Sequence, residues 1–233
     1  MRQAVGRLLE IELAGEAIAG RIACPDDLLP APGQYLLATP LDDPQTALAV
    51  PLFATGMSTG DGLIAAPIPH AWSPGSLLAL HGPLGRGFKM PASARRVSLA
   101  AFGDTPARLL PLVVQALGRH AAVSLYVDLL PDDPVLRNLP PAVEISPLDN
   151  ANEAAAWADF LAMDVPLSGL ADLPLRIGLE KDRGLGCEAQ VLVWTGMPCG
   201  GLAECGACAV RTRKVWSLAC KDGPVYNLNE LSF

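Results

Sequence analysis

Four cysteines near the C-terminus constrain this chain more than any other feature of its sequence. They are spaced C-x5-C-x2-C-x11-C and are Cys199, Cys205, Cys208 and Cys220. Two iron atoms bridged by two sulfides need four thiolates. Plant-type ferredoxins take three of these from one tight loop and the fourth from further along the chain. The spacing therefore predicts a 2Fe–2S cluster held by these four cysteines.

The residues around the cysteines suit a loop that wraps round a cluster. Such a loop must turn several backbone N–H groups towards sulfur, which requires left-handed backbone angles that glycine adopts most easily. Gly200, Gly201 and Gly206 stand beside the ligands. Residues 211–218 are rich in β-branched and aromatic side chains, and they are predicted to form the hairpin that returns Cys220 to the loop.

A zinc site is the main alternative, because four cysteines that include one C-x2-C pair also suit tetrahedral zinc. Structural zinc usually draws on two separated C-x2-C pairs, whereas three of these four cysteines crowd into one loop. We therefore favour the iron–sulfur interpretation. The two other cysteines, Cys24 and Cys187, stand apart and are interpreted as ordinary thiols of the protein interior.

Composition narrows the class of protein further. The chain has 233 residues, 51% of them hydrophobic, and a formal net charge of −7, so it can bury a large core but has little basic surface for nucleic acid. Its most apolar stretch, residues 109–117, is far shorter than the roughly 20 residues of a membrane span. The N-terminus lacks a signal-peptide pattern. We therefore expect a cytoplasmic protein, in which clustered thiols serve metal or redox chemistry rather than disulfides.

The pattern of apolar residues divides the chain into three parts. In residues 1–92, short strands separated by Gly and Pro turns predict an antiparallel β-barrel. In residues 93–194, strands alternate with helices and predict an α/β domain with a parallel sheet. Residues 195–233 are too few to build a core of their own and form the cluster module. The expected fold class is thus a multidomain α+β protein.

Two helices are expected in the second part. The first begins with Thr105 as its N-cap and Pro106 at the first helical position, and runs to about Leu117. The second is the alanine-rich segment 150–163.

Several motifs resemble the electron-transfer subunit of two-subunit dihydroorotate dehydrogenases, a family within the ferredoxin reductase superfamily. The cysteine loop and the sequence Cys-Lys-Asp-Gly-Pro-Val-Tyr at 220–226 resemble the tail of that subunit. Pro-Gly-Gln-Tyr at 32–35 is similar to its Pro-Gly-Gln-aromatic strand, and Gly-Pro-Leu-Gly-Arg-Gly-Phe at 82–88 to its interdomain junction. The resemblance implies FAD on the barrel, electron transfer between FAD and the cluster, and a partner subunit that carries FMN. In the complete enzyme, electrons pass between that subunit and NAD.

The flavin strand departs from this family's pattern. The family has Arg-Pro-x-Ser, in which the arginine holds the FAD pyrophosphate and the hydroxyl contacts the flavin. The best match here is Val50, Pro51, Leu52 and Phe53. Both polar anchors are replaced by apolar side chains, and valine cannot make the charge-assisted phosphate contact of arginine. We therefore expect FAD binding to be weak or lost.

The nucleotide loop departs as well. In place of the family's run of glycines, residues 101–108 read Ala-Phe-Gly-Asp-Thr-Pro-Ala-Arg, with one glycine, Gly103, and with Asp104 where a pyrophosphate would approach. We do not expect tight NAD binding.

These observations predict an electron-transfer subunit of an oxidoreductase, with the 2Fe–2S cluster as its dependable redox centre and a flavoprotein as its partner. The sequence indicates no general acid, base or nucleophile, so a component of an enzyme is expected rather than a self-sufficient one. The alternative is a structural or regulatory subunit that has lost FAD and NAD binding and whose metal serves only to fold the tail.

Overall fold

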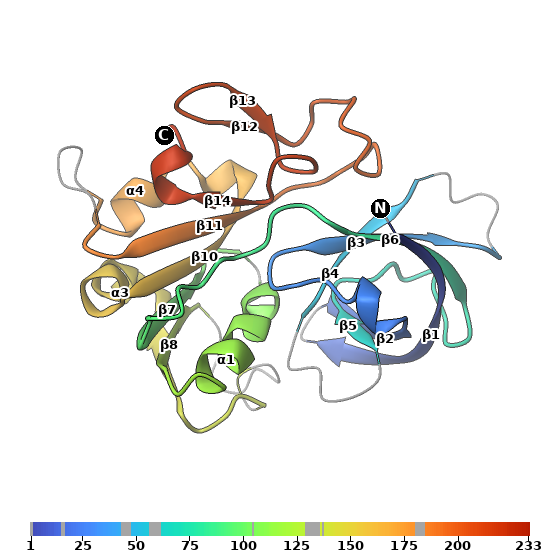
Figure 1. Ribbon diagram of the computed structural model, residues 1–233, viewed down its shortest axis with the longest axis horizontal. Coiled ribbons are helices and arrows are strands. Elements are labelled where there is room, and N and C mark those ends of the chain that lie inside the picture. Colours follow the sequence, from blue (N-terminus) through green and yellow to red (C-terminus); the bar gives the residue numbers. More distant parts are fainter. Residues whose placement is uncertain are drawn as a thin grey trace.

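The computed structural model describes residues 2–14, 17–42, 48–55, 62–103, 105–128, 136, 138–179 and 185–233. Figure 1 shows a β-barrel on one side, a sheet flanked by helices on the other, and a small C-terminal module above both. The expected fold class is confirmed. The exact domain boundaries at 92 and 194 stay a prediction.

The barrel is a six-stranded antiparallel sheet that curls until its two edge strands approach one another. The strand order is β4-β3-β6-β1-β2-β5, and a bridge between Ala54 and Ala65 joins its two ends. Alternate side chains point inward, and Leu8, Ile22 and Leu80 are fully buried in its core. The strands are β1 (Arg2–Ala14), β2 (Ala17–Ala23), β3 (Tyr35–Pro40), β4 (Val50–Phe53), β5 (Leu63–Ala65) and β6 (Leu77–Leu84), with a 3-10 turn at Asp26–Leu28.

The second sheet has the order β14-β11-β10-β7-β8-β9, in which only β14 runs antiparallel. Its central strands are buried on both faces and read as continuous apolar runs, as expected for a helix-covered parallel sheet. Its strands are β7 (Arg96–Ala101), β8 (Ala122–Val127), β9 (Val143–Pro147), β10 (Phe160–Pro166), β11 (Glu188–Trp194) and β14 (Val225–Asn227). The helices are α1 (Leu110–Leu117), α3 (Ala151–Trp157) and α4 (Leu173–Arg176), with 3-10 turns at Ala107–Leu109, Leu148–Asn150, Leu167–Gly169 and Leu228–Glu230.

The predicted helix over 150–163 is wrong in its second half. α3 ends at Trp157, and the chain continues as strand β10. β10 pairs with β7 on one side and β11 on the other, and six of its seven residues are buried. Burial at the centre of the sheet therefore decides the conformation of this apolar run, against the helical propensity of the alanines before it.

The helix predicted from Thr105 also begins later than expected. The hydroxyl of Thr105 does accept a hydrogen bond from the N–H of Ala107 at 3.2 Å, but the first turn is a 3-10 turn and α1 starts at Leu110. Pro111 accounts for the shift, because proline lacks an N–H and is tolerated only in the first turn of an α-helix.

The C-terminal module consists of the cysteine loop and a two-stranded hairpin, β12 (Ala209–Arg211) and β13 (Trp216–Leu218). The hairpin expected in 211–218 is thus confirmed, although its first strand starts two residues earlier. The module shares one continuous buried cluster with the parallel sheet, and that cluster includes Tyr35 and Phe53 of the barrel. None of the helices in the described part of the chain is both long and apolar enough to span a bilayer.

Candidate metal centre

The loop that carries the first three cysteines has an unusual backbone. Gly200, Gly201 and Gly206 have φ values of 59°, 76° and 72°, which confirms that these glycines supply left-handed turns. Ala203 also has a positive φ, 63°, a conformation that side chains other than glycine's rarely adopt. Nothing in the sequence predicted a left-handed conformation for Ala203. Four left-handed residues within seven positions fold the chain back on itself around Cys199 and Cys205.

Backbone groups of this loop point at the first cysteine. The pKa of the Cys199 thiol is lowered to about 6, chiefly by a hydrogen bond from the N–H of Glu204 and next by the thiol of Cys205. The N–H groups of Cys205 and Ala203 contribute as well. The loop thus stabilises a thiolate at Cys199, which is the form that binds a metal.

The second pair of cysteines is Cys208 and Cys220. The pKa of Cys220 is raised to about 12 by burial, by a hydrogen bond with the Cys208 side chain, and by the charges of Cys208 and Cys199. A backbone bond from the N–H of Ala219 to the carbonyl of Cys208, at 2.9 Å, holds the two ends of the hairpin together. These interactions link Cys199 with Cys205 and Cys208 with Cys220, and the charge of Cys199 also acts on Cys220.

Exposure differs sharply among the four side chains. Cys208 and Cys220 are buried, Cys199 is half-buried, and Cys205 is exposed. Within the described residues, no three His, Cys, Asp or Glu side chains stand close enough to hold a single metal ion. Cys24 and Cys187 lie half-buried elsewhere, and burial raises the pKa of each thiol.

A barrel side chain reaches the fourth cysteine. The hydroxyl of Tyr35 on β3 donates a hydrogen bond of 2.6 Å to the carbonyl oxygen of Cys220, and the tyrosine is fully buried. The same hydroxyl lies 3.4 Å from where a Cβ on Gly201 would be, so it stands between the two halves of the cysteine loop. Its pKa is raised by burial, so the phenol remains a donor. The Pro-Gly-Gln-aromatic motif pointed to this strand, but not to this contact.

The residues predicted as the eroded flavin strand form β4 at the edge of the barrel. Leu52 and Phe53 are buried, and Val50 is half-buried. The ring of Phe53 packs 5.4 Å from that of Tyr35 and 5.6 Å from that of Trp194, centroid to centroid. Apolar and aromatic contacts therefore occupy the position where the family places a hydroxyl.

A buried ion pair lies at the carboxyl edge of the parallel sheet. Asp164 lies near the end of β10, and its carboxylate accepts a hydrogen bond of 2.7 Å from Nε of Arg108. Both side chains are almost fully buried, at 1% and 0% exposure, and the guanidinium stacks 4.5 Å above the ring of Trp194. Ligands of open α/β sheets bind at this edge. Sequence reasoning missed the pair, since its members are 56 positions apart. Asp104 lies outside the described residues.

Comparison with known families supports the interpretation of the tail. Residues 196–232 match the model of the iron–sulfur cluster binding domain of dihydroorotate dehydrogenase B. This segment contains all four cysteines of the constellation. No curated protein sequence matches the chain.

Solved structures with the same fold are ferredoxin reductases and their relatives. The NADH-dependent reduced ferredoxin-NADP oxidoreductase, studied for flavin-based electron bifurcation, superposes with a TM-score of 0.74 at 17% identity, covering 98% of this chain and 90% of the other. The ferredoxin-NADP+ reductase of Plasmodium falciparum gives 0.57 at 10% identity, with coverages of 82% and 96%. The ferredoxin reductase in carbazole 1,9a-dioxygenase gives 0.55 at 13%, with coverages of 78% and 67%. At these identities the likeness establishes the fold.

The chain thus combines an iron–sulfur binding domain with a ferredoxin-reductase-like fold. The matched segment bears out the resemblance of the cysteine loop and of residues 220–226 to this iron–sulfur domain, and the superpositions establish the fold.

Proposed function

From an iron–sulfur domain on a reductase-like fold, we propose that this chain transfers electrons through one 2Fe–2S cluster held by Cys199, Cys205, Cys208 and Cys220. The observation that carries the proposal is the match of residues 196–232, which contain all four cysteines, to an iron–sulfur cluster binding domain. A cluster with two irons needs two thiolates on each iron, whereas tetrahedral zinc needs all four around a single centre. The interactions of Cys199 with Cys205 and of Cys208 with Cys220 suit a division of the four thiolates between two irons.

When bound, such a cluster accepts and releases one electron at a time. The protein's part is to hold the thiolates and tune their surroundings. N–H groups of the left-handed loop point at Cys199 and favour its charged form. Burial of Cys208 and Cys220 keeps water from one side of the site, while Cys205 is exposed.

We include the absence of FAD and NAD in the proposal, because the residues present do not fit these groups. At the carboxyl edge, where sheets of this kind bind dinucleotides, this chain has a single glycine, Gly103, in the loop after β7 and the buried ion pair of Arg108 and Asp164. On the barrel, Val50 and Phe53 offer neither a cation for pyrophosphate nor a hydroxyl for a flavin ring. The cluster is then the redox centre of the chain.

A chain with one single-electron centre depends on other proteins for both donor and acceptor. The match to a dihydroorotate dehydrogenase B domain suggests a flavoprotein subunit as one of them. A cytoplasmic setting belongs to the same proposal, because a reducing compartment keeps clustered thiols available for iron.

The first test is the metal and flavin content of anaerobically purified protein. We expect about two irons and two sulfides per chain, from the stoichiometry of the cluster, a reddish-brown colour, and no flavin released by heat. A colourless protein with one zinc per chain would overturn the iron–sulfur assignment and favour the structural or regulatory alternative. FAD released in a one-to-one ratio would overturn the claim about Val50 and Phe53.

A second test uses two cysteine variants as a matched pair. Cys208→Ser removes a buried member of the second pair and should abolish the visible absorbance of the cluster. Cys187→Ser changes a half-buried thiol outside the site and should leave that absorbance intact. Equal bleaching in both variants would show that the ligand assignment is wrong.

A further inference from the structure

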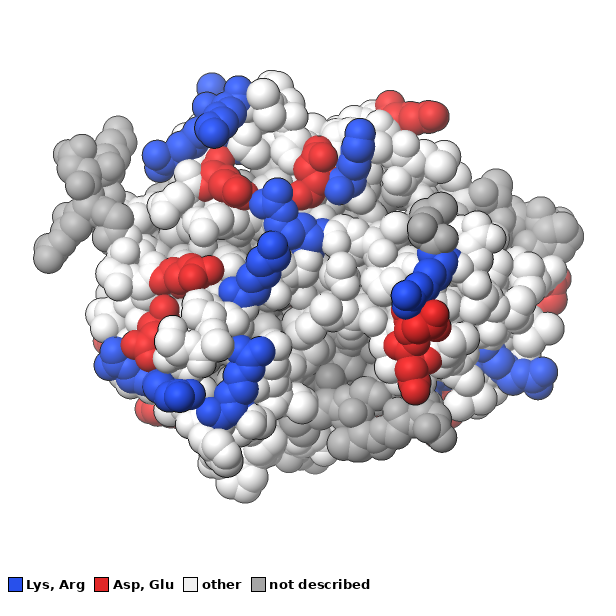
Figure 2. All heavy atoms as spheres, viewed as in Figure 1, with Lys and Arg blue, Asp and Glu red and all other residues white. Residues whose placement is uncertain are grey.

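The C-terminal module carries basic side chains on a protein that is acidic as a whole. The hairpin has Arg211, Arg213 and Lys214 exposed at its tip, against a formal net charge of −7 for the chain. Figure 2 shows basic side chains over β12 and β13 at the upper left, with basic and acidic side chains interspersed below them on the same face. A local patch of opposite sign is needed for an acidic partner to approach an acidic protein.

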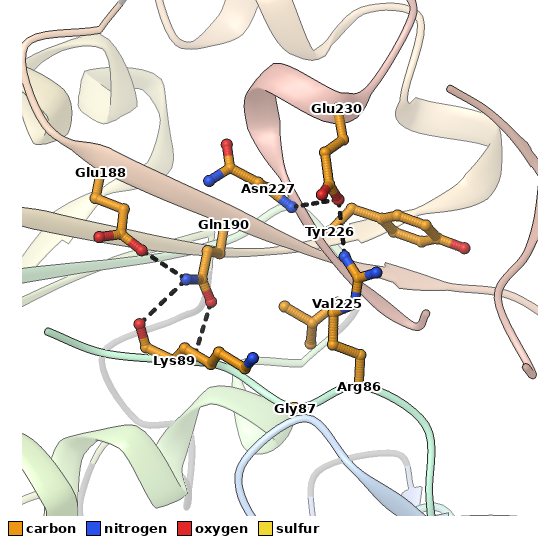
Figure 3. Close-up of a pocket in the computed structure, with 9 residues that line it drawn as sticks. All are labelled: Arg86, Gly87, Lys89, Glu188, Gln190, Val225, Tyr226, Asn227 and Glu230. Atoms are coloured by element: carbon orange, nitrogen blue, oxygen red, sulfur yellow. Dashed lines mark hydrogen bonds and ion pairs between the residues drawn. The ribbon is translucent and has the colours of Figure 1, made fainter. Parts of the chain in front are cut away.

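Two adjoining hollows run beneath this patch. The first, of about 410 Å³, is drawn in Figure 3 and lies between the interdomain junction and β14, with Arg86 and Lys89 on its wall. The second, of about 430 Å³, lies beside the hairpin and is lined by Arg213, Lys214 and Trp216. Arg86, Tyr226 and Glu230 border both hollows, so they form one groove from the junction to the hairpin.

The carboxylates of the groove accept hydrogen bonds from neighbouring groups of the chain. Its carboxylates are held by groups of the chain itself: Glu230 pairs with Arg86 at 2.8 Å, and Glu188 accepts from Gln190 at 2.9 Å (Figure 3). Asp222 accepts from the N–H of Leu218 at 3.1 Å.

Among the described residues, no carboxylate forms an ion pair with Lys89, Arg213 or Lys214. The lining of the two hollows carries four cations and three carboxylates, and the positive charge is concentrated at the hairpin, where Arg211, Arg213 and Lys214 are exposed within four positions. This end of the groove complements an acidic surface.

An apolar anchor stands next to these charges. Trp216 is 70% exposed and its neighbour Val215 is 67% exposed, so the hairpin tip presents a tryptophan to solvent. Tryptophan and arginine are the residue types most enriched among those that dominate the binding energy of protein interfaces. A tryptophan beside exposed cations has the composition of a docking site for a protein.

The hairpin also connects two of the proposed cluster ligands along the chain. β12 begins at Ala209, directly after Cys208, and β13 ends at Leu218, two residues before Cys220. The two buried cysteines thus flank the base of the hairpin, and the basic side chains and Trp216 stand at its tip.

The geometry points to the groove and hairpin, from Arg86 and Lys89 to Arg213, Lys214 and Trp216, as the docking surface for an acidic electron-transfer protein. This inference rests on the proposed function, because it makes the partner a recipient or donor of the cluster's electron. One electron leaves the reduced cluster and one centre of the partner is reduced, or the reverse.

The test uses the full chain with its cluster and, as the probe, a purified acidic flavodoxin. Binding is measured by anaerobic titration calorimetry at about 0.01 M and about 0.15 M salt, between which the Debye length falls from about 30 to about 8 Å. We expect tighter binding at low salt. The double variant R213E/K214E should weaken binding at low salt at least about tenfold, since it places like charges against the partner.

Two further variants make the assignment specific. Trp216→Ala should weaken binding about thirtyfold, the loss typical of an interface hot spot. Arg7→Glu reverses an exposed charge on strand β1 of the barrel and should change binding less than twofold. All three sets of changes lie at exposed side chains, and the visible spectrum of each variant reports whether the cluster is intact.

Failure of this inference is distinct from failure of the proposed function. If flavodoxin does not bind at low salt, binds all variants equally, or is matched by basic cytochrome c, the docking surface is refuted while the cluster stands. If instead the purified chain has no iron, the proposed function is refuted, and the salt and variant data still decide the surface.

Discussion

The hydroxyl of Tyr35 is a direct contact between the barrel and the cysteine module. Tyr35→Phe keeps the ring that packs against Phe53 and removes the hydrogen bond to the Cys220 carbonyl. Because both residues are buried, the variant leaves a buried acceptor without this donor, which costs about 1–3 kcal/mol. For a chain of this size, each kcal/mol corresponds to a fall in Tm of roughly 2–4 °C.

The assay compares this variant with Tyr226→Phe. Tyr226 is equally buried and in the same part of the fold, but its hydroxyl bonds the side chain of Ser217 at 3.1 Å rather than the backbone of a cysteine. Both variants should lose similar stability. Tyr35→Phe alone should shift the reduction potential and hasten the loss of visible absorbance on warming, because only Tyr35 positions Cys220.

Cluster properties that change equally in the two variants would refute the role of Tyr35 in positioning Cys220. That role would equally be refuted if Tyr35→Phe lowered the Tm but left both the potential and the rate of bleaching at wild-type values. In that case Tyr35 would act in packing alone, and the contact with Cys220 would have no bearing on the cluster.

Two other features of the parallel sheet make separate predictions. Arg108→Met should destabilise the protein by about 3–5 kcal/mol by leaving Asp164 charged and buried, and adding Asp164→Leu should restore much of that loss, as measured by urea unfolding. The pKa of Asp159 is lowered, first by the backbone N–H of Arg95 and then by the side chain of Arg96. Its contribution to stability is therefore present above the carboxyl's unfolded pKa and lost as the pH falls through the lower folded value. Asp159→Asn should weaken the fall of the free energy of unfolding at acid pH, measured by urea unfolding at several pH values. An unchanged pH dependence would contradict the role given to the Asp159 carboxylate.

Much of the fold could be predicted from local pattern. Short strands separated by turn residues in 1–92, and strands alternating with helices in 93–194, predicted a barrel followed by a parallel sheet, and both are present. The helix over 150–163 was wrong because conformation there depends on strand neighbours. β10 is enclosed by β7 and β11, and sequence pattern alone cannot distinguish a buried strand from a buried helix.

By itself, the sequence determined the cysteine spacing and the glycines that let the loop adopt left-handed angles, since both depend only on residues close together in the chain. Only the tertiary structure decided what surrounds the site. Tyr35 meets Cys220 across 185 positions, and Arg108 meets Asp164 across 56. Contacts of this kind arise when distant segments pack into one core, and they leave no local periodicity from which they could be inferred. The cysteine pattern of an iron–sulfur site can thus be recognised in the sequence. The ion pair at the carboxyl edge of the sheet and the groove beside the hairpin exist only in the folded chain.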